Sequence, residues 1–151
     1  ELQEKEVGER IKNAIVGSLK QYSVPINIRV EYAKAESIGG EALVWGVFST
    51  DGKVDYDNPI ILVGDALVEK NKSSEEIGKE AADELKRQID AGAAVDHHLV
   101  DQLIQFMGLL PGSKIKAGEV SKHAETNMYI VEKFLPVGFK VEKNMVSVEE
   151  K

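Results

Sequence analysis

The 151-residue chain contains no cysteine, and that absence removes two kinds of structure at once. Without thiols there is no disulfide framework and no thiolate metal site, so a cytoplasmic setting is the default expectation. Long apolar runs are absent too: none approaches the roughly 20 residues that a membrane-spanning helix needs, and the sequence has no secretory signal pattern. We therefore expect a cytoplasmic protein without a membrane partner.

Positive charge is also scarce, with 19 Lys and Arg against 26 Asp and Glu and a net charge of -7. This balance argues against diffuse, non-specific binding of nucleic acid by this surface alone. A local basic groove, or one supplied by other sequence, remains compatible with it. The chain begins at Glu1, inside a helical pattern and without an initiator Met, which suggests one segment of a longer polypeptide.

With 42% hydrophobic residues the chain is too apolar for disorder, and its length suits one ordinary core or two small ones. Helical spacing predicts a helix over about residues 4–22. We predict three strands next. Residues 26–30 alternate between apolar and polar side chains, and residues 42–48 are densely apolar, with Trp45 in the core. The third strand, residues 60–63, is short.

A turn signal, a helix cap and a run of small residues define the rest of the first half. Asp51-Gly52 is typical of a hairpin turn. Ser73 and Glu76 have the spacing of a capping box, which opens a helix to about residue 89. Small residues around Gly92 then mark a junction. We therefore predict an α+β protein with a small α/β domain over residues 1–92, helices packed on a short sheet, and a second domain over residues 93–151.

In the second half, Asp96 and Ser121 are expected N-caps of two helices joined by a short strand at residues 114–117. For the first helix, we predict a buried stripe of Leu99, Leu103 and Phe106. On the second, Ala124, Met128, Val131 and Leu135 are expected to pack inward. Residues 139–142 and 145–148 alternate and predict a closing hairpin.

All three histidines lie at the starts of these two helices. For His123 the simplest interpretation is an ordinary surface histidine. A second interpretation follows from the helix terminus, whose partial positive charge favours neutral imidazole and whose free amides can hold a phosphate. A neutral imidazole can attack a nucleotide phosphorus, with a carboxylate such as Asp101 to orient it. Spacing alone does not decide whether Asp101 approaches His123.

His98, Asp101 and Gln102 recur at helical spacing, so they can act on one ligand or simply form a solvated face. Adjacent histidines project roughly 100° apart on a helix, so a metal ion shared by His97 and His98 is not expected. No HExxH spacing is present, and we predict no metal ligands. His97 is interpreted as exposed to solvent.

The segments AVDHHLVDQLIQFMGLL and SKHAETNMYIVEKFL, with their separation, resemble the C-terminal part of the RNA 3'-terminal phosphate cyclase family. Upstream, EALVWGVFSTDG and GDALVEKNKSSEEIGKEAADEL are similar to the small domain inserted in that family. The resemblance covers essentially the whole chain, and its DQL and His123 segments are the specific part. It implies that residues 93–151 are the C-terminal βα-repeat portion of a larger catalytic cyclase domain.

The resemblance also implies an enzyme, a ligase of RNA processing, that uses ATP to convert an RNA 3'-terminal phosphate into a 2',3'-cyclic phosphate. His123 matches the nucleophile that takes AMP from ATP, and Asp101 and Gln102 match the DQL residues that lie beside both the nucleotide and the nucleophile. His98 matches a position that lies against the nucleotide. Mg2+ is expected with the ATP phosphates but need not be bound by these residues.

The match has gaps. The segment at residues 37–40 has fewer glycines than the family pattern, and Val68 and Asn71 stand where relatives tend to have glycine. The N-terminal half of the family is missing from this sequence, so that half is an expected partner and the chain alone is not expected to be a competent cyclase. The alternatives are a non-catalytic, cyclase-like scaffold that binds RNA or ribosomal partners, and a generic α+β binding module.

Overall fold

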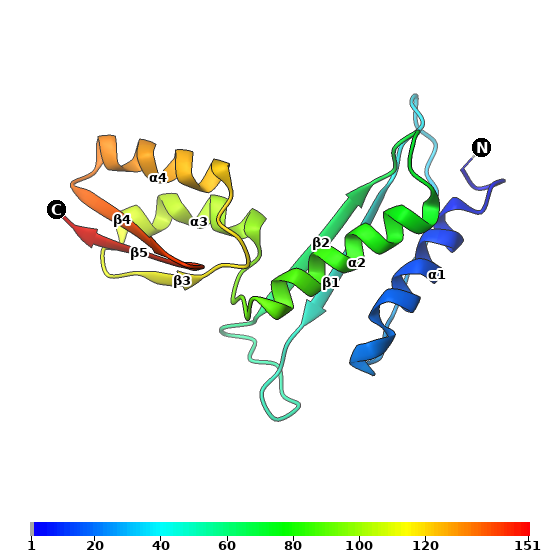
Figure 1. The fold of residues 1–151 in the computed structure, drawn as a ribbon, viewed down its shortest axis with the longest axis horizontal. Helices are drawn as coiled ribbons and strands as arrows, with labels where there is room; N and C mark the ends of the chain where they lie inside the picture. The colour runs from blue at the N-terminus through cyan, green and yellow to red at the C-terminus, as the bar shows by residue number, and fades with distance from the viewer. Residues whose placement is uncertain (1) are drawn as a thin grey trace. The chain divides into compact units, whose positions relative to one another are not determined.

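The computed structural model describes residues 2–151 and has a mixed α+β architecture, as the sequence predicts (Figure 1). The chain divides into two compact units. The first contains the chain up to Trp45 together with Val63–Lys86, and the second contains Gly46–Leu62 and Arg87–Lys151. No helix among the described residues has both the length and the apolar character to cross a membrane.

Most of the first unit consists of two α-helices, one short 3-10 helix and a hairpin of two strands. In chain order these elements are α1 (Val7–Leu19), η1 (Lys20–Tyr22), β1 (Glu41–Val47), β2 (Ile61–Leu67) and α2 (Ser74–Asp90). The predicted capping box forms: the Ser73 amide donates to Glu76 Oε2 at 2.7 Å, and the Glu76 amide donates to Ser73 Oγ at 3.2 Å. These reciprocal bonds satisfy amides that the first turn of α2 would otherwise leave unpaired.

Two glycines allow the first unit to close. A Cβ at Gly64 in β2 would overlap the backbone of α2 at Ala81 and Leu85. A Cβ at Gly78 in α2 would meet the Ile11 carbonyl oxygen of α1. The backbones therefore approach closely at both points, and the side chains buried around them include Ile15, Val44, Ala66, Ile77 and Ala82.

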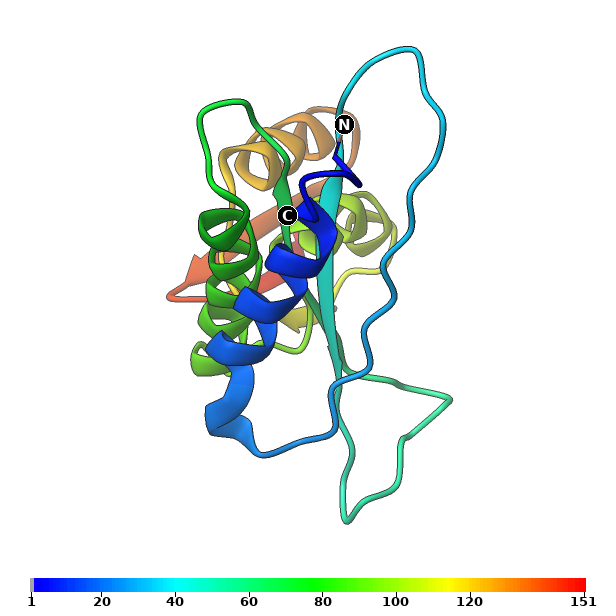
Figure 2. The ribbon, with the colours of Figure 1, turned by 90° about the vertical axis from the view of Figure 1, so that its right-hand side faces the viewer.

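The predicted strand at residues 26–30 is wrong. This segment runs as extended chain without regular strand pairing (Figure 2). Its alternation survives as half-buried Ile26, Ile28 and Val30, because alternation determines which face a side chain occupies but does not supply a hydrogen-bonding partner. Trp45 is also corrected: it is 60% exposed, since β1 buries only one face.

The larger part of the second unit is a three-stranded sheet covered by two helices. Its elements are α3 (His97–Leu109), β3 (Lys114–Lys116), α4 (Lys122–Phe134), β4 (Val137–Glu142) and β5 (Met145–Glu150). The strands are antiparallel in the order β3-β5-β4, and the predicted hairpin of β4 and β5 is confirmed. Val146 and Val148, alternate residues of β5, join side chains of both helices in one core. Both helices therefore pack on the same face of the sheet.

The core-facing stripe of α3 differs from the prediction. Val100, Ile104 and Met107 are buried, whereas Phe106 is 62% exposed and Leu99 38% exposed. The two stripes have the same spacing and are both apolar, so periodicity could not distinguish them. On α4 the predicted inward face is confirmed, with Ala124 and Met128 in the core.

Candidate functional site

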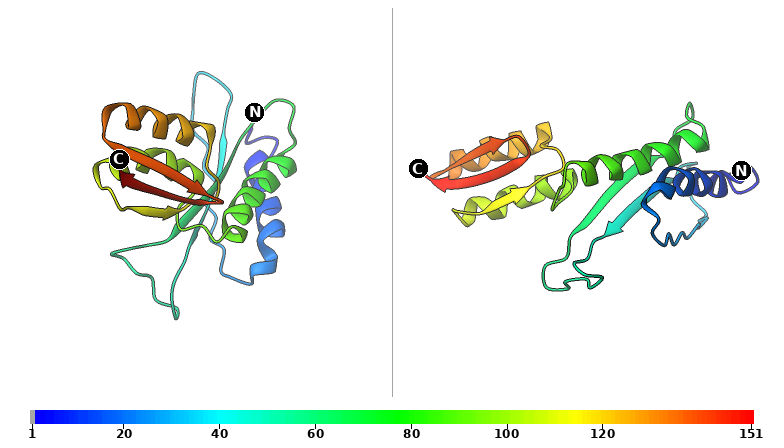
Figure 3. Two further views of the ribbon diagram at one scale, coloured as in Figure 1. Left: turned by 60° about the vertical axis from the view of Figure 1, so that its left-hand side comes forward. Right: turned by 60° about the horizontal axis from the view of Figure 1, so that its bottom comes forward.

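The two helices of the second unit begin side by side. A parallel bridge pairs Val95 with Ala117, just before α3 and a short distance before α4. The Ala94 amide donates to the Lys116 carbonyl oxygen at 2.8 Å, and the Gly118 amide donates to that of Val95 at 3.1 Å. Figure 3 shows α3 and α4 running in the same direction from this point. Their amide-rich N-termini therefore lie at one end of the unit, which gives that end partial positive charge.

Each helix has the N-cap that the sequence predicts. Asp96 accepts a hydrogen bond from the Leu99 amide at 2.8 Å. Ser121 Oγ accepts one from the Ala124 amide at 3.1 Å. A cap of this kind stabilises a helix by about 1 kcal/mol. Ser121 has a second contact that its role as a cap does not require.

That second contact joins α4 to Asp101 of α3. Ser121 Oγ donates to Asp101 Oδ1 at 2.6 Å. Asn127 Nδ2, from the next turn of α4, donates to the Asp101 carbonyl oxygen at 3.0 Å. Asp101 is half-buried. Through these two hydrogen bonds, α4 fixes both the side chain and the backbone of Asp101.

His123 is the second residue of α4 and its side chain is exposed. His123 lies four residues before Asn127, so the two residues share one face of α4. The hydrogen bond from Asn127 to the Asp101 carbonyl oxygen shows that this face is turned toward Asp101. Helical side chains lean toward the N-terminus, which directs His123 toward the open end of the helix pair. Within residues 2–151 His123 makes no hydrogen bond or ion pair. Asp101 is therefore bonded to residues on either side of His123 in α4 and not to His123 itself.

The paired histidines of α3 lie at the same end of the unit. The His97 and His98 rings are in contact, tilted by 37° with their centroids 3.9 Å apart, and His98 is exposed. His97 is not the solvent-exposed side chain that we predicted: it is half-buried, and its Nδ1 lies 2.9 Å from Nε2 of buried Gln88. Gln102 is exposed on α3 next to Asp101. The four predicted site residues, His98, Asp101, Gln102 and His123, therefore all come from the first two turns of two neighbouring helices.

Sequence reasoning missed the second roles of Ser121, Asn127 and Gln88. The sequence identifies Ser121 as an N-cap, and this role alone accounts for a serine at that position, so nothing in the sequence indicates the contact with Asp101. Gln88 carries no signal, because its position in α2 resembles that of any polar residue near a helix end. Each of these roles depends on packing between segments distant in sequence.

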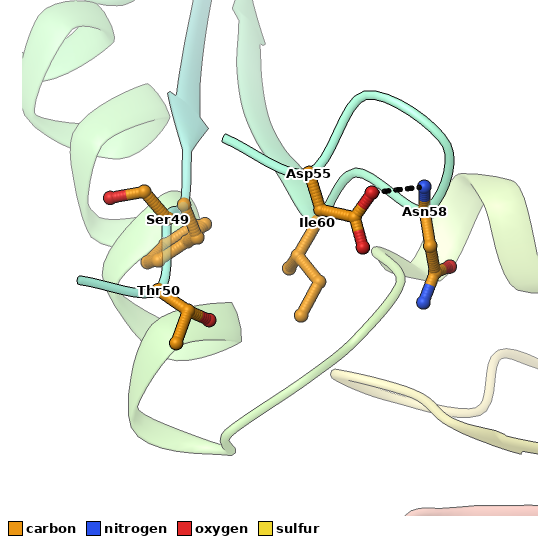
Figure 4. A pocket seen from close by; sticks show the side chains of 6 residues that line it. Ser49, Thr50, Asp55, Asn58 and Ile60 are labelled. Atoms are coloured by element: carbon orange, nitrogen blue, oxygen red, sulfur yellow. Dashed lines mark hydrogen bonds between the residues drawn. The ribbon is translucent and has the colours of Figure 1, made fainter. Parts of the chain in front are cut away.

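A small pocket lies elsewhere in the second unit, in the loop that connects β1 and β2 (Figure 4). Phe48, Ser49, Thr50, Asp55, Asn58 and Ile60 line it, and none of them is a predicted site residue. Asp55 Oδ1 accepts from the Asn58 amide at 3.1 Å, so this carboxylate organises its own turn.

These features define a class of protein: an α+β segment in which two parallel helices carry His98, Asp101, Gln102 and His123 near their shared N-terminal end. A sequence profile of the RNA 3'-terminal phosphate cyclase family matches residues 6–141. The chain belongs to this family.

Individual relatives agree with the profile, and each carries the name RNA 3'-terminal phosphate cyclase. The chain is 38% identical over 135 residues to that of Pyrococcus furiosus, and the aligned region covers 89% of this chain and 36% of the relative. It is 37% identical over 139 residues to that of Pyrobaculum neutrophilum, covering 91% and 38%. It is 41% identical over 121 residues to that of Thermococcus onnurineus, covering 80% and 33%. The matched region therefore spans only 33–38% of the length of these relatives.

Proposed function

We propose that the polypeptide that carries this chain is an ATP-dependent RNA 3'-terminal phosphate cyclase, and that His123 is its nucleophile. The observation that carries the proposal is the attachment of Asp101 to the start of α4, by its N-cap Ser121 and by Asn127 one turn further on. It brings the aspartate of the DQL segment to the turn that presents His123. A chance histidine on a solvated helix end has no need of such an arrangement.

The proposed reaction has three steps. A nitrogen lone pair of His123 attacks the α-phosphorus of ATP, so that an N–P bond forms and the bond to diphosphate breaks. A phosphate oxygen at the RNA 3'-end then attacks the same phosphorus, which releases His123 and forms a mixed anhydride with AMP. The neighbouring 2'-hydroxyl attacks the terminal RNA phosphorus, loses its proton, and expels AMP to leave the 2',3'-cyclic phosphate.

The site residues have distinct tasks in this proposal. Asp101 stabilises the positive charge that His123 gains when it attacks. His98 and Gln102 bind the nucleotide, and Asp101 lies beside it as well as beside His123. Ser121 caps the Ala124 amide, so the first two amides of α4, those of Lys122 and His123, are the ones that point at the end of the helix where the α-phosphate would lie. These donors fit a nucleoside triphosphate, and a divalent ion such as Mg2+ would offset the charge of its phosphates.

The proposed cyclase requires sequence beyond this chain. The chain covers 36% of the Pyrococcus furiosus relative, and the remaining sequence would supply further contacts to ATP and RNA. The partners in the proposal are therefore ATP, RNA with a 3'-terminal phosphate, and the rest of the same polypeptide in the cytoplasm.

A test uses the complete polypeptide incubated with α-labelled ATP and Mg2+. We expect a covalent AMP adduct that is acid-labile, as a phosphoramidate is, and that is absent in His123→Asn. Because His123 is exposed, this substitution should leave the unfolding midpoint close to that of the unmodified protein. His97→Asn, at a histidine outside the proposed set, should still form the adduct.

Absence of an adduct in the folded, complete protein would contradict the proposal and favour a cyclase-like scaffold that binds RNA or ribosomal partners. An adduct that persists in His123→Asn would place the nucleophile elsewhere.

A further inference from the structure

The contacts made by Asp101 point to a role for two residues of α4 that sequence spacing does not single out. Asp101 Oδ1 accepts from Ser121 Oγ at 2.6 Å, and the Asp101 carbonyl oxygen accepts from Asn127 Nδ2 at 3.0 Å. His123 lies between these two donors in the chain, so the donors are attached to both sides of its turn. The short O–H···O distance is typical of a charge-assisted bond to a carboxylate.

Ser121 also links Asp101 to the backbone of α4. Its Oγ accepts from the Ala124 amide at 3.1 Å while its proton goes to Asp101. An amide at the positive end of the helix, the hydroxyl and the carboxylate thus form one chain of hydrogen bonds, in which each bond polarises the next. Because Ser121 uses only one carboxylate oxygen, the other remains for an imidazole that moves toward it.

We propose that Ser121 and Asn127 are positioning residues, which fix Asp101 relative to His123 for attack on the nucleotide. This inference rests on the proposed function, because it assumes that His123 is the nucleophile. Both residues act through Asp101 and need not touch ATP. Their effect should therefore fall on the rate constant for adenylation rather than on the ATP concentration that half-saturates it.

Variants at position 121 separate positioning from capping. Ser121→Asp keeps an oxygen that caps a helix as well as serine does, but it cannot donate to Asp101 and faces it with like charge. Ser121→Thr keeps both the cap and the donated proton. We expect Ser121→Asp to adenylate roughly 10- to 100-fold more slowly, the size of effect that a small misplacement of reacting groups produces. Ser121→Thr should stay within about 3-fold of the unmodified protein, on the same principle.

Two further variants test the second anchor. Asn127→Asp preserves size but removes the amide donor, so it should slow adenylation in the same direction. Thr126→Ala is the matched control: its Oγ1 donates to the Lys122 carbonyl oxygen at 2.8 Å and does not reach Asp101. This control should adenylate at the rate of the unmodified protein.

The measurement is single-turnover formation of the AMP adduct in the complete polypeptide over a range of ATP concentrations, with the urea midpoint of each variant. Slow adenylation in Ser121→Asp, in protein that its urea transition shows to be folded under the assay conditions, is the expected result. Equal rates for Ser121→Asp and the unmodified protein would overturn the inference while leaving the proposed function intact. Absence of any adduct in the unmodified protein would be a failure of the proposed function and would remove the inference with it.

Discussion

At the scale of single residues, Gly118 shows how one missing side chain shapes the site end of the second unit. A Cβ at position 118 would overlap Oε1 of Gln88, the residue that pairs with His97. Gln88 is only 4% exposed, so it has little room to move. Glycine is therefore required here by close approach and not by backbone conformation, since its φ is not positive.

Gly118→Ala should lower the free energy of unfolding by about 1–3 kcal/mol, the usual cost of forcing an extra carbon into a packed site. Far-UV circular dichroism during urea unfolding measures it. Replacing Gln88 by Ala in the same protein should recover part of the loss, because the overlapping group is then gone. Gly17→Ala is the matched control: nothing lies within 4 Å of a Cβ in this α1 position, so the change should be neutral or stabilising by up to about 1 kcal/mol. Equal loss in both variants would contradict the argument.

Residues at a fixed spacing in one helix could be placed on neighbouring faces from the sequence, whereas contacts between different helices could not be predicted. His98, Asp101 and Gln102 are neighbours by helical geometry alone. The contact between Asp101 and Ser121 depends on how α3 and α4 pack, and nothing in the local pattern of either segment specifies that packing. The contact of His97 with Gln88 of α2 was unpredictable for the same reason.

At the scale of elements, Glu132 joins the end of α4 to the strands that follow it. Its Oε1 accepts from the Phe139 amide of β4 at 2.7 Å, and its Oε2 accepts from Lys151 Nζ at 2.9 Å. The Phe139 amide first, and the Lys151 ammonium second, lower the pKa of Glu132 below its ordinary value of 4.5. A carboxylate with a depressed pKa contributes stability above its unfolded-state pKa, and this contribution is lost as the pH falls through the folded-state value.

Glu132→Gln should therefore lower the urea midpoint at pH 7 and flatten its decline on acidification below about pH 4.5, where the native carboxylate takes up its proton. Urea midpoints at intervals from pH 7 to pH 3 provide the measurement. Glu119→Gln, at an exposed loop carboxylate, serves as the comparison and should keep the acid dependence of the unmodified protein. A Glu132→Gln profile parallel to the unmodified one would show that the carboxylate does not contribute.

Elements with their own local signals were predicted well, and elements defined by partners were not. Ser73 and Glu76 form their box within four residues, and Asp51 and Gly52 adopt the positive φ values, 54° and 75°, of a tight hairpin turn. Residues 26–30 carry the alternation of a strand, but a strand exists only when another pairs with it. The exposed Phe106 illustrates the same limit, because α3 is apolar on more than one face and its neighbours decide which face is buried.

At the scale of the whole molecule, the proposed chemistry and the extent of the chain make a joint prediction. The chain holds the helix pair with His123 and Asp101, but it spans only 36–38% of the Pyrococcus furiosus and Pyrobaculum neutrophilum relatives. Adenylation needs a nucleophile together with groups that hold ATP in line for attack, and poor alignment alone can cost several orders of magnitude in rate. We therefore expect residues 1–151 by themselves to bring about no detectable cyclisation of RNA carrying a 3'-phosphate.

The complete polypeptide should cyclise the same RNA, and adding the remaining sequence as a separate chain should restore part of the activity if the two parts assemble. Thin-layer separation of the terminal nucleotide after digestion measures the 2',3'-cyclic product. Circular dichroism of residues 1–151 controls for folding, because an unfolded fragment would be inactive for a trivial reason. Cyclisation by the folded fragment at the rate of the complete protein would mean that this chain alone aligns ATP and RNA. The donors at the N-termini of α3 and α4 would then suffice, and the need for further sequence would be disproved.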